Sequence, residues 1–201
     1  MAPLSHSKED MMTRKIVLGG VLGGLALFAW GMVSHMALGL TDSSVKSLPN
    51  ETAIVGALQE SVKAPALYVF PAAGMEAPPD QKEAAMKDWS EAYRRGPRGL
   101  LIYEPTGGNP SMASFLLTQL GVCVVVCLIA AWVLGQAAAA VPRYGNRVCL
   151  VSALGLLASV FVDVPYWNWY SFPSHYTLMA LVDRTVGMTV AGLVIARFVK
   201  S

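Results

Sequence analysis

The chain has 201 residues, of which 54% are hydrophobic and only 14% are charged, whereas ordinary soluble domains are about 25% charged. Together with a mean hydropathy of +0.48, this composition excludes a soluble domain and a disordered chain. The net charge of +2 is too small for a nucleic-acid-binding protein, and three cysteines do not make a disulfide framework. The composition indicates an integral membrane protein.

Four apolar runs are long enough to cross a hydrocarbon core, which needs about 20 helical residues. They cover residues 16–40, 112–141, 147–164 and 178–199. The first run is longer than the core of a signal peptide and lacks a cleavage pattern of small residues, so we expect an uncleaved anchor. The third run is expected to stop at Pro165. The alternative is three spans, with the last helix lying on the membrane surface.

Basic residues in the tails and short loops predict the orientation, because such residues gather on the cytoplasmic side. They occur in the tail of residues 1–15, in the second loop at Arg143 and Arg147, and at the C-terminal end, whereas the loop of residues 165–177 has none. We therefore predict that both termini are cytoplasmic and that residues 41–111 lie outside.

The outward segment of residues 41–111 carries signals for regular structure. Asn50 precedes an apolar repeat typical of a helix and is expected to be its N-cap. Asp80 and Glu83 have the spacing of a capping box, and a second helix follows them and ends at Gly96. Two short runs rich in β-forming residues, 66–70 and 99–103, are each closed by a proline.

If these two runs pair in parallel, the second helix is the crossover of a βαβ unit. We expect a small α/β cap that rests on the outer helix ends, with Trp89 and Tyr93 as anchors. The alternative is a loop with two loose helices. The predicted fold class is therefore mainly α, a four-helix transmembrane bundle with a small α/β extracytoplasmic cap between spans one and two.

Polar side chains within the spans gather in the outer third of the bilayer. They are His35, Thr118, Gln119, Ser159, Asp163, Asp183 and Arg184. Ser152, Gly155, Ser159 and Asp163 recur every three or four residues, which predicts one small and polar helix face. Asp183 shares a face with Gly187 and Ala191. The glycines of the first span, at GxxxG spacing, are expected to let a neighbouring helix of the same chain approach closely.

Ionisable groups inside a span cost a few kcal/mol unless they are paired or hydrated, so this cluster has two interpretations. In the first, it is a polar pocket open to the outside, in which His35 and Asp163 exchange protons. In the second, it is a structural lock: Arg184 pairs with Asp163 or Asp183, and His35 bonds a backbone carbonyl.

The loop of residues 165–177 belongs to the most aromatic stretch of the chain. Residues 163–176 contain two Trp, three Tyr and one Phe. Aromatic residues at headgroup depth usually form an interfacial belt. Their concentration between two prolines also fits a surface that docks the outward segment, a partner protein or a flat apolar ligand. The candidate ligand-binding or proton-exchanging residues are therefore His35, Asp163, Trp167, Trp169, His175, Asp183 and Arg184.

Other chemistry has little support. No Cys-x-x-Cys occurs in an outward loop, which argues against a thiol oxidase, and we expect Cys123, Cys127 and Cys149 to be small buried residues. No phosphate-binding glycine loop is present. We predict no cofactor and no metal site. A bis-histidine haem would have to use His35 and His175, and a quinone would have to use the outer pocket.

Several short motifs resemble those of a group of small, uncharacterised bacterial inner-membrane proteins with one span, an outward segment and three further spans. The motifs are Trp30-Gly31-x-x-Ser34-His35, Ser47-Leu48-Pro49-Asn50-Glu51, Tyr103-x-Pro105-x-Gly107-Gly108 and Pro165-Tyr166-Trp167-Asn168-Trp169-Tyr170-x-Phe172-Pro173. This group has no activity to carry over. The resemblance implies the architecture and a multi-pass location in a bacterial inner membrane.

The expected function is that of a non-enzymatic accessory or scaffold subunit that packs against a larger membrane complex or against itself. Its partners would be the lipid bilayer and a membrane protein or a second copy, and not nucleic acid. One alternative is a module that binds a lipid, quinone or pigment, or carries protons, through the outer polar pocket. A third is an envelope enzyme with its site on the outward segment.

Overall fold

The structure is a computed structural model that describes residues 3–40, 44–72 and 77–200, with side chains from Asp10 onward. The first residues of the predicted outward segment, 41–43, therefore lie outside the described residues. The chain folds as two compact units. One contains residues 1–45, 110–165 and 174–201, and the other contains residues 46–109 and 166–173.

Four long helices make up most of the first unit. They are α1 (Pro3–Met32), α4 (Met112–Ala137), α5 (Tyr144–Tyr170) and α6 (Ser174–Phe198). A π-helical turn, Val33–Ala37, extends α1. All four are long and apolar enough to cross a membrane. A helix is suited to this because it satisfies its own backbone hydrogen bonds in apolar surroundings. This confirms the prediction of a mainly helical protein with four helices of membrane-spanning length.

The third helix continues through Pro165, where the sequence predicted its end, and runs to Tyr170. Only residues 171–173 remain of the predicted loop, because α6 starts at Ser174. A proline removes one backbone hydrogen bond from a helix, but transmembrane helices tolerate this loss. The helix ends where Ser171 adopts a left-handed conformation, with φ of 62°.

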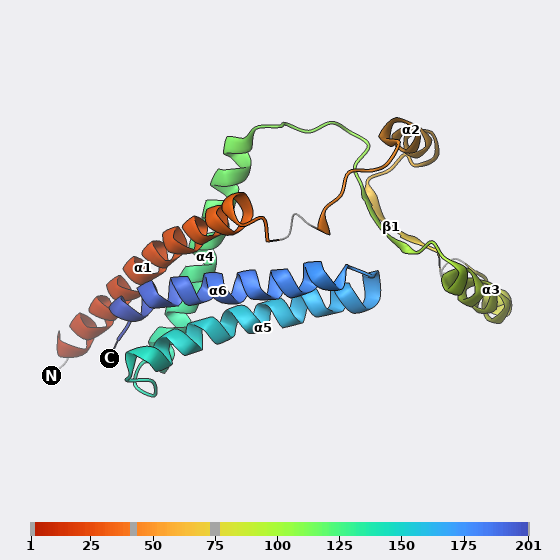
Figure 1. The fold of residues 1–201 in the computed structure, drawn as a ribbon. Coiled ribbons are helices and arrows are strands. Elements are labelled where there is room, and N and C mark those ends of the chain that lie inside the picture. Colours follow the sequence, from red (N-terminus) through yellow and green to blue (C-terminus); the bar gives the residue numbers. More distant parts are fainter. Residues whose placement is uncertain (1–2, 41–43, 73–76, 201) are drawn as a thin grey trace. The chain divides into compact units, whose positions relative to one another are not determined.

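Glycines let α1 pack closely against both α4 and α6 (Figure 1). A Cβ atom at Gly24 would lie 2.6 Å from Cα of Val124 in α4, and one at Gly23 would lie 2.6 Å from Cγ1 of Ile195 in α6. Gly20 and Gly19 repeat these two contacts one turn earlier. The two GxxxG pairs therefore serve packing within the chain, as the sequence predicted.

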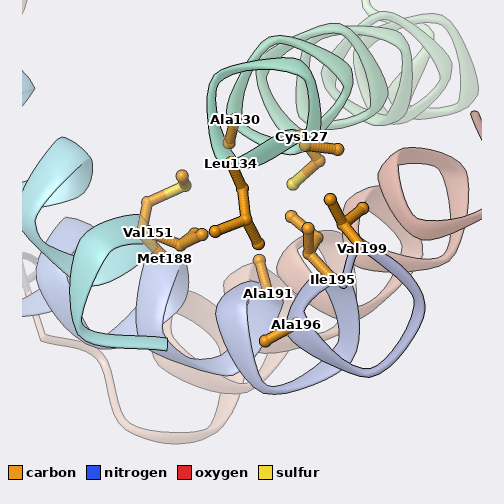
Figure 2. Close-up of a cluster of buried hydrophobic side chains, with 10 residues drawn as sticks. Cys127, Ala130, Leu134, Val151, Met188, Ala191, Ile195, Ala196 and Val199 are labelled. Carbon is orange, nitrogen blue, oxygen red and sulfur yellow. The ribbon is translucent and has the colours of Figure 1, made fainter. Parts of the chain in front are cut away.

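The apolar core lies between α4, α5 and α6 (Figure 2). Leu134 of α4 points toward Val151 of α5 and toward a row of α6 side chains that includes Met188 and Ile195. Both Leu134 and Val151 are fully buried. The same cluster includes the small side chains of Cys127, Ala130 and Ala191.

The second unit contains two helices and a two-stranded sheet. In chain order the elements are α2 (Glu51–Ser61), β1 (Ala66–Phe70), α3 (Lys82–Arg95) and β2 (Gly99–Tyr103). The strands pair antiparallel, with Ala66 opposite Tyr103 and Phe70 opposite Gly99. The predicted parallel βαβ unit is therefore wrong. Its crossover helix would have to cover one face of the sheet, and α3 has no buried residue.

In this unit, the predicted positions of the helices agree with the structure better than the predicted helix caps do. Asn50 stands at the N-cap of α2, but it is left-handed and its side chain makes no capping hydrogen bond. The predicted capping box is also wrong, because α3 starts at Lys82 and Gln81 is its N-cap. Gly96, with φ of 68°, ends α3 as predicted.

After β2, Glu104 accepts hydrogen bonds from the hydroxyl and the backbone N–H of Thr106, at 2.6 and 3.1 Å. These donors hold the pKa of the Glu104 carboxyl below its usual value. The carboxylate thereby stabilises the turn through which the chain leaves the sheet.

Candidate functional site

Two adjacent residues of α6 contact two different helices. Successive residues of an α-helix point about 100° apart, so Asp183 faces α1 while Arg184 faces α5. Both lie roughly 14 Å along α6 from its first residue, at 1.5 Å per residue. We call this cluster the polar layer, and its members are Trp30, His35, Ser159, Asp163, Asp183 and Arg184.

On the α1 side, Asp183 holds a tryptophan and a histidine. The indole Nε1 of Trp30 donates to Oδ1 of Asp183 at 2.8 Å and to its backbone oxygen at 3.2 Å. Nε2 of His35 lies 3.5 Å from Oδ2 of the same carboxylate. The histidine sits in the π-helical turn and its side chain is 53% exposed, whereas that of Asp183 is 16% exposed.

Gly187, one turn after Asp183, makes room for Trp30. A Cβ atom there would lie 2.9 Å from Cδ1 of Trp30 and 2.8 Å from Cδ1 of Leu27. The face of α6 that the sequence assigned to Asp183, Gly187 and Ala191 is thus the face that packs on α1. A small residue at this position allows the indole to reach the carboxylate.

On the α5 side, Asp163 is the most enclosed charge of the layer. Nη1 of Arg184 lies 2.5 Å from its Oδ2, and the Ser159 hydroxyl donates to the same oxygen. The Asp163 side chain is 4% exposed and that of Arg184 is 43% exposed. Ser159 is fully buried. Because a buried carboxylate needs a counter-charge and hydrogen-bond donors, these contacts explain how Asp163 is tolerated inside the protein.

The helix α5 brings these groups to α6 through one narrow face. Its buried residues recur at every fourth position and are Arg147, Val151, Gly155, Ser159 and Asp163. Gly155 permits the close approach, since a Cβ atom there would lie 2.6 Å from Cβ of Met188. Midway along the pair, Thr189 donates to the Ser152 hydroxyl at 2.8 Å. The small and polar stripe predicted from the sequence is therefore the α6-facing side of α5.

The predicted partners within the layer are partly right. Arg184 pairs with Asp163, as the structural-lock interpretation expected. Nε2 of His35 faces Asp183 and Asp163 pairs with Arg184, so the predicted His35–Asp163 proton-exchanging pair is wrong. Asp163 is already paired with Arg184, which leaves Asp183 as the carboxylate that faces α1.

Other predicted members lie elsewhere. Thr118 donates to the backbone of Ser114 in its own helix, and Gln119 lies 3.7 Å from the sulfur of Cys123. His175 is exposed at the start of α6. Cys123 and Cys127 are buried as predicted, but Cys149 is exposed, because it lies on the side of α5 opposite the buried stripe that starts at Arg147.

Trp30 is the residue of the layer that the sequence analysis missed. It precedes His35 by five positions, and its only distinctive signal is its membership of the Trp30-Gly31-x-x-Ser34-His35 motif. A tryptophan near the end of a span is ordinarily assigned to the interfacial belt. The donation of its N–H to Asp183 depends on the space above Gly187, which the sequence of α1 does not reveal.

The aromatic residues 166–173 belong to the second unit. Tyr166 stacks on Phe172, with ring centroids 5.3 Å apart. Trp169 lines a cavity of about 150 Å³ together with Trp89 and Tyr93 of α3, and both Trp167 and Trp169 are largely exposed. Trp89 and Tyr93, predicted as anchors of the outward segment, thus line a cavity with the last residues of α5.

The layer offers hydrogen bonds and paired charges. With His35 protonated, two carboxylates face two cations. Within the described residues, no group of three His, Cys, Asp or Glu side chains could hold a metal ion. The arrangement can join α1, α6 and α5, and its exposed imidazole can exchange a proton. No family model, no curated protein and no solved structure matches the chain.

Proposed function

We propose that the protein is a non-enzymatic accessory or scaffold subunit of a membrane complex, built as a four-helix transmembrane bundle with an extracytoplasmic segment between spans one and two. One observation carries the proposal. The ionisable side chains of the polar layer are engaged with one another, as Asp163 with Arg184 and Asp183 with His35 and Trp30. Groups held in this way stabilise the helix packing, so the function lies on the outer surfaces.

The sheet of the second unit supplies such a surface. Leu67 and Ile102 lie directly opposite each other in the two strands and are 66% and 73% exposed. Val69 lies on the same face, two residues along the strand, and is also exposed. Exposed apolar side chains of a membrane-spanning helix would contact lipid, but this sheet lies outside the four long helices. Contiguous apolar surface of this kind is typical of a protein contact.

The glycine motifs of α1 are not the contact we propose. Gly20 and Gly24 are covered by α4, and Gly19 and Gly23 by α6. A second copy could not use them without displacing a helix of its own chain. The remaining surfaces are the outer apolar faces of the helices and the exposed face of the sheet.

We further propose that both termini are cytoplasmic, that residues 41–111 lie outside and that the membrane is the inner membrane of a bacterium. The distribution of basic residues supports the orientation. The resemblance of the short motifs supports the bacterial setting.

Purification in a mild detergent tests the accessory role. We expect the protein to elute with a stoichiometric membrane partner or as a defined oligomer, measured by light scattering and mass spectrometry. The Leu67→Ser/Ile102→Ser double variant should lose this association and keep its helical content. Met86→Ser is the matched control, because Met86 is an exposed apolar residue of α3. A wild-type protein that is monomeric and free of partners would contradict the proposal.

A second candidate function is a small-molecule or proton-carrying module at the outer face. The observation that favours it is the half-exposed His35 in a π-helical turn beside Asp183, since π-helical turns often occur at functional sites. Its candidate residues remain His35, Asp163, Trp167, Trp169, His175, Asp183 and Arg184. The test is proton flux into liposomes that contain the wild-type protein or the His35→Ala variant. Flux that the substitution abolishes without loss of fold would support this function, and equal flux in the two proteins would exclude it.

A further inference from the structure

A shallow cavity of about 320 Å³, largely open to the surface, lies at the end of the α5–α6 pair opposite the polar layer. Its lining residues are Tyr144 and Arg147 of α5, Ala196 and Arg197 of α6, and Lys200 after α6. In the transmembrane arrangement proposed above, on which this inference rests, this end of the helix pair lies at the level of the lipid headgroups. Three of its five lining side chains carry a positive charge.

Arg147 is the buried member of this set, with only 7% of its surface exposed. Its Nε donates to the backbone oxygen of Ala196 at 3.2 Å, and its Nη1 donates to that of Pro142 at 2.6 Å. The guanidinium carbon lies 6.0 Å from the centre of the Tyr144 ring. These partners orient the side chain, but they carry no formal charge. A buried guanidinium with neutral partners requires a counter-charge from elsewhere.

Within the described residues, neither this end of α5 nor this end of α6 provides a counter-charge. Residues 137–162 and 185–201 contain no Asp or Glu. The ion pairs found among the described residues both lie in the polar layer. The contact that α1 makes here brings a further cation, since Lys15 donates to the backbone oxygen of Lys200 at 3.5 Å. Among the described residues, the three cations that line the cavity thus have no ion-pair partner.

We propose that this cavity binds the phosphate headgroup of an anionic phospholipid. A guanidinium matches two phosphate oxygens at once, and an ammonium group adds a point charge. Basic pockets between transmembrane helices are suited to anionic lipid headgroups. Arg147 forms the floor of the site, and Arg197 and Lys200, which are exposed, form its rim. The Tyr144 hydroxyl, which donates to the Leu193 oxygen at 2.7 Å, fixes one wall.

Lipid retention tests the proposal on the full chain. The protein is reconstituted in nanodiscs of phosphatidylcholine and phosphatidylglycerol in equal parts and then extracted into mild detergent. Native mass spectrometry counts the lipids that remain bound. We expect phosphatidylglycerol to be retained in preference to phosphatidylcholine. Arg197→Gln and Lys200→Gln should each weaken retention about fivefold, and the double variant about 25-fold, from the usual contribution of one basic residue near a membrane surface.

Arg14→Gln is the matched control, because Arg14 is an exposed arginine of α1 that does not line the cavity. It removes the same charge and so lowers general attraction to an anionic surface equally, but it should leave retention unchanged. Equal loss in Arg14→Gln and Arg197→Gln would overturn the proposal, because it would show a delocalised surface effect. Equal retention of the two lipids would overturn it as well.

Two further measurements complete the test. Arg147→Gln removes the buried charge, and circular dichroism shows whether its helices persist. The rim variants keep the test decisive if this variant unfolds, since their side chains are exposed. Inorganic phosphate is then added to the delipidated protein. If phosphate raises the unfolding temperature as much as phosphatidylglycerol does, the site binds the free anion and the lipid assignment is overturned.

Discussion

Asp163 depends on two donors, and the removal of one of them should be costly. In Arg184→Gln the carboxylate keeps the Ser159 hydroxyl but loses its counter-charge. We expect the free energy of unfolding to fall by about 3 kcal/mol, the lower end for breaking a buried pair, because the 43% exposure of Arg184 leaves it partly solvated. Unfolding in detergent, followed by circular dichroism, measures this change.

The Asp163→Asn/Arg184→Gln double variant provides the control. If the two residues stabilise the protein through each other, the double variant loses less stability than the sum of the two single variants. Additive losses would show that each residue acts independently, and the ion pair would then not hold α5 against α6.

The residues of the layer differ in how far sequence could predict them. Gly155, Ser159 and Asp163 recur at helical spacing, so their common face was predicted, and it is buried. Arg147 continues the same spacing, but the sequence analysis counted it among the basic residues of the second loop. The partner of His35 depends on which helix α1 approaches, and sequence within α1 carries no information on that. The predicted His35–Asp163 pair failed for this reason.

At the scale of helices, glycine positions on α1 make a matched pair for mutation. Gly24→Ala should destabilise the protein by about 1–3 kcal/mol, the cost of overpacking, because the new Cβ atom would lie 2.6 Å from the backbone of Val124. Gly31→Ala lies on the same helix, and nothing lies within 4 Å of its Cβ position. It should leave stability unchanged or raise it, since alanine favours helix. Unfolding midpoints of the two variants, measured side by side, provide the comparison; equal midpoints would contradict the packing described for α1 and α4.

Element boundaries were predictable where one local signal decides them. Gly96 ends α3 because a left-handed residue stops a helix locally. Pro165 failed as a stop signal, because a proline within a helix removes one backbone hydrogen bond and does not by itself end the helix, which continues to Tyr170. The direction of the strand pair failed too, since residues 66–70 and 99–103 pair equally well by sequence in either direction. The structure pairs them antiparallel.

For the whole molecule, hydropathy alone was sufficient to predict four helices of spanning length, because the bilayer sets both their length and their composition. The second unit contains residues 46–109, which lie within the predicted outward segment of residues 41–111, together with residues 166–173. Trp169 and Trp89, far apart in the sequence, line one cavity in this unit. The aromatic composition of residues 163–176 fits a surface that docks the outward segment, but periodicity within a segment cannot identify the residues that meet there.

The predicted orientation leads to a labelling experiment on the whole chain. In a Cys149→Ser background, which removes the exposed native thiol, Gln59→Cys places a thiol on the exposed surface of α2 and Asn146→Cys places one at the exposed start of α5. Because basic residues flank Asn146, we expect it to be cytoplasmic and residue 59 to be outside. A membrane-impermeant maleimide should therefore label Gln59→Cys in intact cells and Asn146→Cys only after permeabilisation. The reverse pattern would invert the topology and place the Arg147 cavity at the outer face; labelling of both in intact cells would contradict a span between them.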